Sequence, residues 1–190
     1  MSGPTARYVL KPDPHSSHSI ILRWLGQGNG RRLLDVGAAD ALLSRKLTER
    51  GWRVTAVEGD PALAQVGAQH CERMVVANLD REIPLLDGPF DAIVYADVLE
   101  HLTDPLRVIS DLDRHLAPDG FVIVSVPNIA HLYIRLLLLF GRFDYIDRGI
   151  PAALAYQLSR GTLHIGIEPA TQPAVRRHHH QQCLALLPRS

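Results

Sequence analysis

The sequence predicts an α/β fold, in which helices flank a doubly wound and mostly parallel sheet. Short apolar runs rich in β-branched residues recur along the chain, and stretches with apolar residues at helical spacing separate them. The chain has 190 residues, of which 46% are hydrophobic, so it is long enough to bury one α/β core. We expect that core within residues 1–150.

Five segments have the length and composition of buried strands, namely residues 32–36, 53–57, 73–76, 91–95 and 121–126. Helical stretches connect them, which favours parallel pairing. In a sheet of this kind, ligands bind outside the carboxyl ends of the strands, near the point where the strand order reverses. We therefore expect the functional residues at these strand ends.

Four segments have helical periodicity, namely residues 16–25, 41–50, 61–70 and 105–116. Gly26 and Gly51 follow the first two, and Pro118 and Gly120 follow the last, so these three helices have natural stops. Residues 116–120 are then expected to form the loop before the fifth strand. Ser16 or Ser17 is suited to cap the first helix.

Composition and charge exclude several classes of function. Twenty basic residues balance twenty acidic ones, which argues against a nucleic-acid partner. Only Cys71 and Cys183 are present, which is typical of a reduced, cytoplasmic protein. Residues 1–15 lack the apolar core of a secretory signal. The apolar run 132–140 is too short to span a bilayer, which takes ~20 residues, so we expect peripheral membrane contact at most.

The first predicted strand runs into a loop of small residues. Such residues let a ligand approach the backbone closely. A dinucleotide site would need the pattern G-x-G-x-x-G to seat a pyrophosphate, and Gly37 alone of that set is present. An acidic residue within the strand, Asp35, suits a ligand that carries a cationic amino group instead.

Residues 33–41 resemble the first motif of class I S-adenosylmethionine-dependent methyltransferases, usually written L-D-V-G-C-G-x-G. Residues 78–80, 90–102, 116–120 and 126–128 resemble further motifs of that family in the expected order. The resemblance covers residues 15–150 and is greatest to small bacterial enzymes, such as ubiquinone O-methyltransferases and methyltransferases encoded beside glycosyltransferases. It implies a Rossmann-like fold, a methyltransferase domain at residues 1–150 and S-adenosylmethionine as the cofactor.

The resemblance also implies which residues bind that cofactor. Glu58 matches the acidic residue that holds both ribose hydroxyls, and a carboxylate can accept from two vicinal hydroxyls at once. Residues 16–18 resemble a segment that closes over the cofactor. Ala39 and Ala41 stand where glycine is common, and we expect binding to survive these changes. The expected cofactor-binding set is Asp35, Gly37, Ala38, Ala39, Glu58, Gly59, Asn78, Leu79 and Ala96.

A possible catalytic group follows the fourth strand. Asp97, Glu100 and His101 are spaced i, i+3 and i+4, so a helix over residues 96–102 would place them on one face beside the cleft. They could hold a divalent metal ion that polarises a substrate hydroxyl, with His131, just after the fifth strand, joining from the other side. Alternatively, His101 acts alone as a general base, or these residues only cap the helix. Methyl transfer relies mainly on positioning, because the sulfonium donor is already activated.

The last forty residues, 151–190, lack the periodicity of the rest. We expect an atypical tail, disordered or altered, that leaves the acceptor pocket incomplete. Family sheets usually end in an antiparallel pair of strands, which residues 162–167 and 183–187 would supply. The leading hypothesis is O-methylation of a small-molecule, glycan or lipid-precursor acceptor. The alternative is an inactive S-adenosylmethionine-binding partner or regulatory protein. A nicotinamide dehydrogenase lacks the required glycines, and the oligomeric state is left open.

Overall fold

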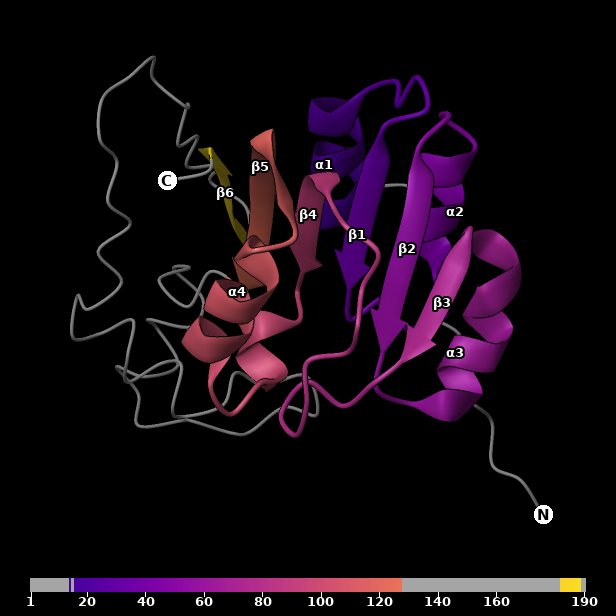
Figure 1. The fold of residues 1–190 in the computed structure, drawn as a ribbon. Helices are drawn as coiled ribbons and strands as arrows, with labels where there is room; N and C mark the ends of the chain where they lie inside the picture. The colour runs from indigo at the N-terminus through magenta and orange to yellow at the C-terminus, as the bar shows by residue number, and fades with distance from the viewer. Residues whose placement is uncertain (1–13, 15, 128–181, 189–190) are drawn as a thin grey trace, which may run out of the picture.

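A six-stranded sheet forms the centre of the molecule (Figure 1). The computed structural model describes residues 14, 16–127 and 182–188. The strand order is β3-β2-β1-β4-β5-β6; the first five strands are parallel, and β6 runs antiparallel to β5. The strands are β1 (Arg32–Val36), β2 (Arg53–Glu58), β3 (Arg73–Val76), β4 (Phe90–Ala96), β5 (Leu116–Pro127) and β6 (Gln182–Pro188). The predicted doubly wound, Rossmann-like sheet is confirmed.

The central strand β1 is apolar on both faces, as parallel strands covered by helices must be. Leu33 packs in the cluster on one face of the sheet, whereas Leu34 and Val36 pack in the cluster on the other. All three side chains are completely buried. Burial on both faces explains why apolar residues stand at neighbouring positions of the strand rather than in strict alternation, although the strand also contains the acidic residue Asp35.

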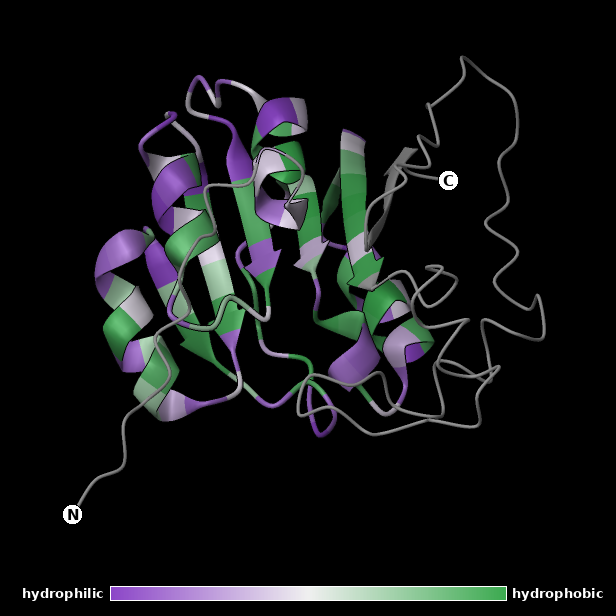
Figure 2. Cartoon of the chain, turned by 180° about the vertical axis from the view of Figure 1, so that it is seen from behind, coloured by the Kyte–Doolittle hydropathy of each residue, from purple (hydrophilic) through white to green (hydrophobic). Residues whose placement is uncertain are grey.

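Helices cover both faces of the sheet. They are α1 (Ser17–Leu25), α2 (Leu42–Thr48), α3 (Pro61–Gly67) and α4 (Pro105–Asp113), with short 3₁₀ turns η1 (Ala68–His70) and η2 (Leu99–His101). The apolar sides of α1 and α2 pack on one face, and that of α4 packs on the other. Both α1 and α2 carry hydrophilic as well as hydrophobic residues (Figure 2). The four predicted helices are all present, although each is shorter than expected.

Each longer helix begins at a polar cap. The Ser16 hydroxyl accepts a hydrogen bond from the backbone N–H of Ser19, and the Asp104 carboxylate accepts one from Arg107. Such caps satisfy backbone donors that have no partner inside the helix. Ser16 is therefore the cap of α1, and Ser17 is left for another contact. None of the described helices is long and apolar enough to cross a membrane.

The fifth strand departs from the sequence prediction. Residues 116–120 were expected to form a loop, but Leu116 pairs with Phe90, and the pairing resumes at Ala92 and Phe121 after a shift of register. A bulge therefore accommodates the turn-forming residues between the two paired segments. At the far edge, β6 supplies the antiparallel strand predicted at 183–187. The predicted strand 162–167 and the apolar segment 132–140 lie outside the described residues.

Candidate active site

A cleft of about 440 Å³ lies at the carboxyl ends of the strands. It is formed by residues at and just after the ends of β1, β2, β3 and β4, together with His18 from the first turn of α1. The strand order reverses between β1 and β4, so the cleft occupies the position at which sheets of this topology bind ligands. All nine residues predicted to bind the cofactor line this cleft.

The loop after β1 requires glycine at its first position. Gly37 has a φ of +72°, a region that side chains disfavour. A Cβ atom on Gly37 would also lie 2.3 Å from Cγ2 of Val98. The backbone N–H groups of Gly37 and Ala38 both donate to the Val57 carbonyl, at 2.8 and 3.0 Å. The loop is thereby fixed between β1 and β2.

Ala39 and Ala41 also have left-handed backbone conformations, with φ of +50° and +58°. These are the two positions at which the resemblance led us to expect glycine. The chain therefore keeps the backbone path that glycine favours while carrying a methyl group at both positions.

Glu58 ends β2 with its carboxylate held in place from two sides. One oxygen accepts a hydrogen bond from the backbone N–H of Ala39 at 2.7 Å, and the other accepts one from Asp60 at 2.8 Å. Each carboxylate oxygen can accept more than one bond. Glu58 therefore retains the capacity to accept from a pair of ligand hydroxyls without first reorienting.

The loop after β3 forms another part of the cleft. Leu79 is buried, and its carbonyl accepts a hydrogen bond from the Arg107 guanidinium at 2.5 Å. The Asp80 carboxylate accepts one from the backbone N–H of Thr103 at 2.8 Å. Asn78 is exposed and accepts from the Asp80 N–H at 3.0 Å. These contacts tie the loop to the start of α4 and hold Leu79 at the cleft as an apolar surface.

The charge of the cleft is strongly acidic. Among the described residues that line it, two are histidines and none is lysine or arginine. Six carboxylates line it, namely Asp35, Asp40, Glu58, Asp60, Asp80 and Asp97. Such a cleft attracts a cationic ligand and repels a pyrophosphate. The charge thus agrees with the inference drawn from the missing glycines.

Asp35 is the most buried of these acids, with 2% of its surface exposed. Burial raises the pKa of its carboxyl from 3.8 to about 6; a hydrogen bond from the Ser44 hydroxyl opposes this increase, and the nearby charge of Glu58 adds to it. The bond from Ser44 measures 2.6 Å. Burial disfavours the negative charge of the Asp35 carboxylate, and a cation bound beside it would stabilise that charge.

The helix predicted over residues 96–102 does not form. Asp97 has a φ of +52°, and the 3₁₀ turn that follows includes only Leu99–His101. Asp97 and His101 line the cleft, whereas Glu100 does not and is only 3% exposed. The expected shared face is therefore wrong, because the left-handed residue breaks the helical spacing. No group of three or more metal-binding side chains occurs within the described part of the chain, and His131 lies outside it.

Asp97 is instead the centre of a hydrogen-bond network. The Ser17 hydroxyl donates to one carboxylate oxygen at 2.8 Å, and the Ser125 hydroxyl donates to the other at 2.6 Å. The backbone N–H of Asp97 also donates to the Ser125 carbonyl at 3.0 Å. Sequence reasoning missed both serine contacts, since Ser17 lies 80 residues from Asp97 and no local pattern links them.

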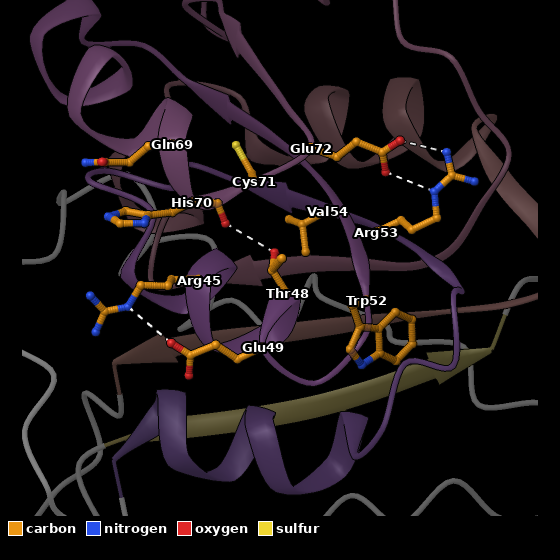
Figure 3. Close-up of a pocket in the computed structure, with 10 residues that line it drawn as sticks. All are labelled: Arg45, Thr48, Glu49, Trp52, Arg53, Val54, Gln69, His70, Cys71 and Glu72. Carbon is orange, nitrogen blue, oxygen red and sulfur yellow. Dashed lines mark hydrogen bonds and ion pairs between the residues drawn. The ribbon is translucent and has the colours of Figure 1, made fainter.

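A second hollow, of about 410 Å³, lies beside the start of β2 (Figure 3). Arg45 pairs with Glu49, and Arg53 pairs with Glu72, so its charged groups largely neutralise one another. It is lined by the first residues of β2 rather than by its carboxyl end. The cleft at the carboxyl ends, and not this hollow, therefore has the location and charge of a functional site.

The sequence of this chain is similar to those of known proteins. A family model described as a methyltransferase domain matches residues 13–162. The ubiquinone biosynthesis O-methyltransferase of Xylella fastidiosa is 32% identical over 154 residues, which is 72% of this chain and 62% of that protein. The protein of the same description from Alkalilimnicola ehrlichii is 35% identical over 114 residues, covering 57% of this chain and 46% of that one. The chain thus spans less than two thirds of the length of these relatives.

Solved structures share the fold. A SAM-dependent methyltransferase from Aquifex aeolicus superposes with a TM-score of 0.62 at 17% identity, covering 95% of this chain and 94% of its own. Magnesium protoporphyrin IX methyltransferase from Synechocystis PCC 6803, solved with bound SAH, gives 0.63 at 18% identity, covering 92% and 82%.

Proposed function

The chain belongs to the methyltransferase domain family, and from that premise we propose that it transfers the methyl group of S-adenosylmethionine to a hydroxyl group of a small molecule. The observation that carries the proposal is the fixed carboxylate of Glu58 in an acidic cleft at the switch point of the sheet. A ribose with two hydroxyls and a ligand with net positive charge both match that site.

The described residues fit S-adenosylmethionine along the length of the cleft. Glu58 is placed to accept from the ribose hydroxyls, and Leu79 offers an apolar surface to the adenine. Asp35 and Asp40 lie by the loop after β1, where a cationic amino group would be stabilised. Gly37 lets the ligand approach the backbone of that loop.

The acceptor is inferred from the relatives. Two of them are described as ubiquinone biosynthesis O-methyltransferases, and we infer a phenolic hydroxyl as the acceptor group. The bound cofactor would supply an activated methyl group on a sulfonium, and the protein would mainly hold that group in line with the acceptor oxygen. A cytoplasmic location and an altered tail at 151–190 remain predictions.

Calorimetric titration tests the cofactor site. We expect S-adenosylhomocysteine and S-adenosylmethionine to bind the wild-type protein in the micromolar range, and NAD not to bind. Glu58→Ala should weaken binding by about 10-fold to 100-fold, because it removes hydrogen bonds to a charged acceptor worth roughly 1.5–3 kcal/mol. Glu72→Ala, which removes an exposed carboxylate at the second hollow, is the matched control. Equal affinity of the wild type and Glu58→Ala would contradict the assignment.

Turnover with catechol as a phenolic probe tests the reaction. The expected result is methylated catechol and S-adenosylhomocysteine in equal amounts. A wild-type protein that binds S-adenosylhomocysteine but methylates no hydroxyl probe would instead support the inactive-partner alternative.

A further inference from the structure

The proposed transfer to a hydroxyl requires a group that takes up the hydroxyl proton, and two imidazoles line the cleft. We propose that His18 is the catalytic base of this reaction and that Asp97 stabilises its protonated form. The inference rests on the proposed function. It assigns a catalytic role to His18, which the resemblance had linked only to a segment that closes over the cofactor.

The first turn of α1 is held at the carboxyl ends of the strands, beside the cleft. Ser17 donates to the Asp97 carboxylate just beyond the end of β4, and His18 is the next residue. Its side chain is partly buried and lines the cleft together with Asp97, Val98 and the loop after β1. A helix that packs on one face of the sheet thus contributes an imidazole to the ligand site.

Asp97 is rigidly placed for an electrostatic role. Hydroxyls of Ser17 and Ser125 engage both of its carboxylate oxygens, and its own N–H is bonded to Ser125. Its backbone φ of +52° lies in the left-handed region, which is uncommon for residues with a side chain, although Asp and Asn adopt it more readily than the others. Such conformations persist where surrounding contacts enforce them, and they are frequent at functional sites.

The charges around His18 suit a proton acceptor. Burial lowers the pKa of its imidazole below 6.5, while the charges of Asp97 and Asp40 act in the opposite direction and raise it. The imidazole is therefore neutral at pH 7 and able to accept a proton. Once protonated, it is stabilised by the charges of these two carboxylates. The other titratable side chains lining the cleft are Asp35, Glu58, Asp60, Asp80 and His101.

His101, the second imidazole, is exposed on the 3₁₀ turn η2. The partly buried position of His18 limits competition from water. The anchored Asp97 lines the same cleft, and its charge raises the pKa of the imidazole. These two features favour His18 over His101 as the base.

The acceptor O–H bond breaks, and its proton passes to an imidazole nitrogen of His18. The acceptor oxygen forms a bond to the methyl carbon, while the electron pair of the broken carbon–sulfur bond stays on sulfur. The products are the methyl ether, S-adenosylhomocysteine and an imidazolium, which later releases its proton to water.

Two measurements on the full chain test this inference. In the first, NMR follows the His18 ring through a pH titration without any acceptor. We expect its midpoint to lie below 6.5 and to fall further in Asp97→Asn, because a stabilising charge is lost. A midpoint that Asp97→Asn leaves unchanged would overturn the role assigned to Asp97.

In the second, His18→Gln is assayed with catechol as acceptor and by calorimetry with S-adenosylhomocysteine. We expect kcat to fall by about 100-fold or more, the acidic limb of the kcat pH profile to disappear, and the dissociation constant to change less than threefold. His70→Gln, at the second hollow, is the matched control and should behave as the wild type.

The outcomes separate the two proposals. If the wild type methylates catechol and His18→Gln retains its kcat and acidic limb, the inference about His18 is wrong and the proposed function stands. If His18→Gln instead loses S-adenosylhomocysteine affinity with kcat intact, His18 is a cofactor contact rather than the base. If the wild type binds S-adenosylhomocysteine and methylates no hydroxyl probe, both proposals fail together.

Discussion

Ala41 and Gly67 pack against each other so closely that a Cβ atom on Gly67 would lie 2.9 Å from the Cβ of Ala41. Ala41 is completely buried and stands at one of the positions where the family commonly has glycine. The missing side chain at 67 therefore provides the room that the extra methyl group at 41 requires. The two positions compensate for each other across the β1–α2 loop and the end of α3.

This contact predicts an energetic coupling between the two positions. Gly67→Ala should destabilise the protein by about 1–3 kcal/mol, because a buried methyl group is added to a filled space. In an Ala41→Gly background the same change should cost less, although Met74 and Asp40 also border the site. Urea unfolding of the two single variants and the double variant gives the coupling energy. If the free-energy changes of the two single variants add up to that of the double variant, the contact with Ala41 does not determine the cost of a side chain at position 67.

The conformation of Ala39 predicts a stabilising substitution. Its φ of +50° costs an alanine roughly 1–2 kcal/mol relative to glycine. Glycine loses more backbone entropy on folding, so the substitution gains only part of that free energy. Ala39→Gly should therefore raise the free energy of unfolding by up to about 1 kcal/mol. Ala38→Gly is the matched control, and it should destabilise because Ala38 does not have a left-handed backbone. The same urea measurement compares them, and a loss of stability in Ala39→Gly would contradict the strain argument.

The sequence predicted the sheet well because strand burial leaves a local signature. The five parallel strands and the acidic residue that ends β2 all follow from apolar runs and from the residues immediately after them. The residues that we propose bind the cofactor lie at those strand ends, where the sequence resembles the motifs of the family.

The part of the cleft that we propose for catalysis was harder to predict, because it depends on backbone conformation and on distant contacts. The spacing of Asp97, Glu100 and His101 suggested one helical face. The left-handed backbone of Asp97 prevents a continuous helix over these residues, so they do not share a face. The contact between Ser17 and Asp97 joins α1 to the end of β4, and only the folded sheet brings these segments together. The bulge that extends β5 back to Leu116 likewise arises from pairing with Phe90.

The burial of Glu100 predicts a pH-dependent stability. Burial raises the pKa of its carboxyl from 4.5 to about 7, and one carboxylate oxygen has no hydrogen-bond partner among the described residues. The folded state then binds more protons than the unfolded state between pH 4.5 and 7, so this group lowers stability as pH rises through that window. Its full cost above pH 7 is about 3 kcal/mol.

Glu100→Gln should remove most of that pH dependence. We expect the variant to gain stability over the wild type above pH 7 and to differ little from it below pH 4.5. Urea unfolding from pH 4 to pH 8 measures the effect, with the exposed Glu82→Gln as the control. A variant that is less stable than the wild type at pH 8 would indicate that the ionised carboxylate has a partner that the amide cannot replace.

Asp35 predicts that cofactor binding releases protons near pH 6. Because burial raises its pKa to about 6, its carboxyl is about half protonated at that pH when the cleft holds no cation. A cationic amino group bound beside it stabilises the carboxylate, lowers the pKa and expels the remaining proton. Calorimetry with S-adenosylhomocysteine at pH 6 should therefore give different enthalpies in phosphate and imidazole buffers, since these buffers take up protons with different heats. The difference should vanish at pH 8, where Asp35 is already ionised, and in Asp35→Asn at either pH. Equal enthalpies in the two buffers at pH 6 would mean that the amino group of the ligand lies away from Asp35, and Asp40 would then be the carboxylate to test in its place.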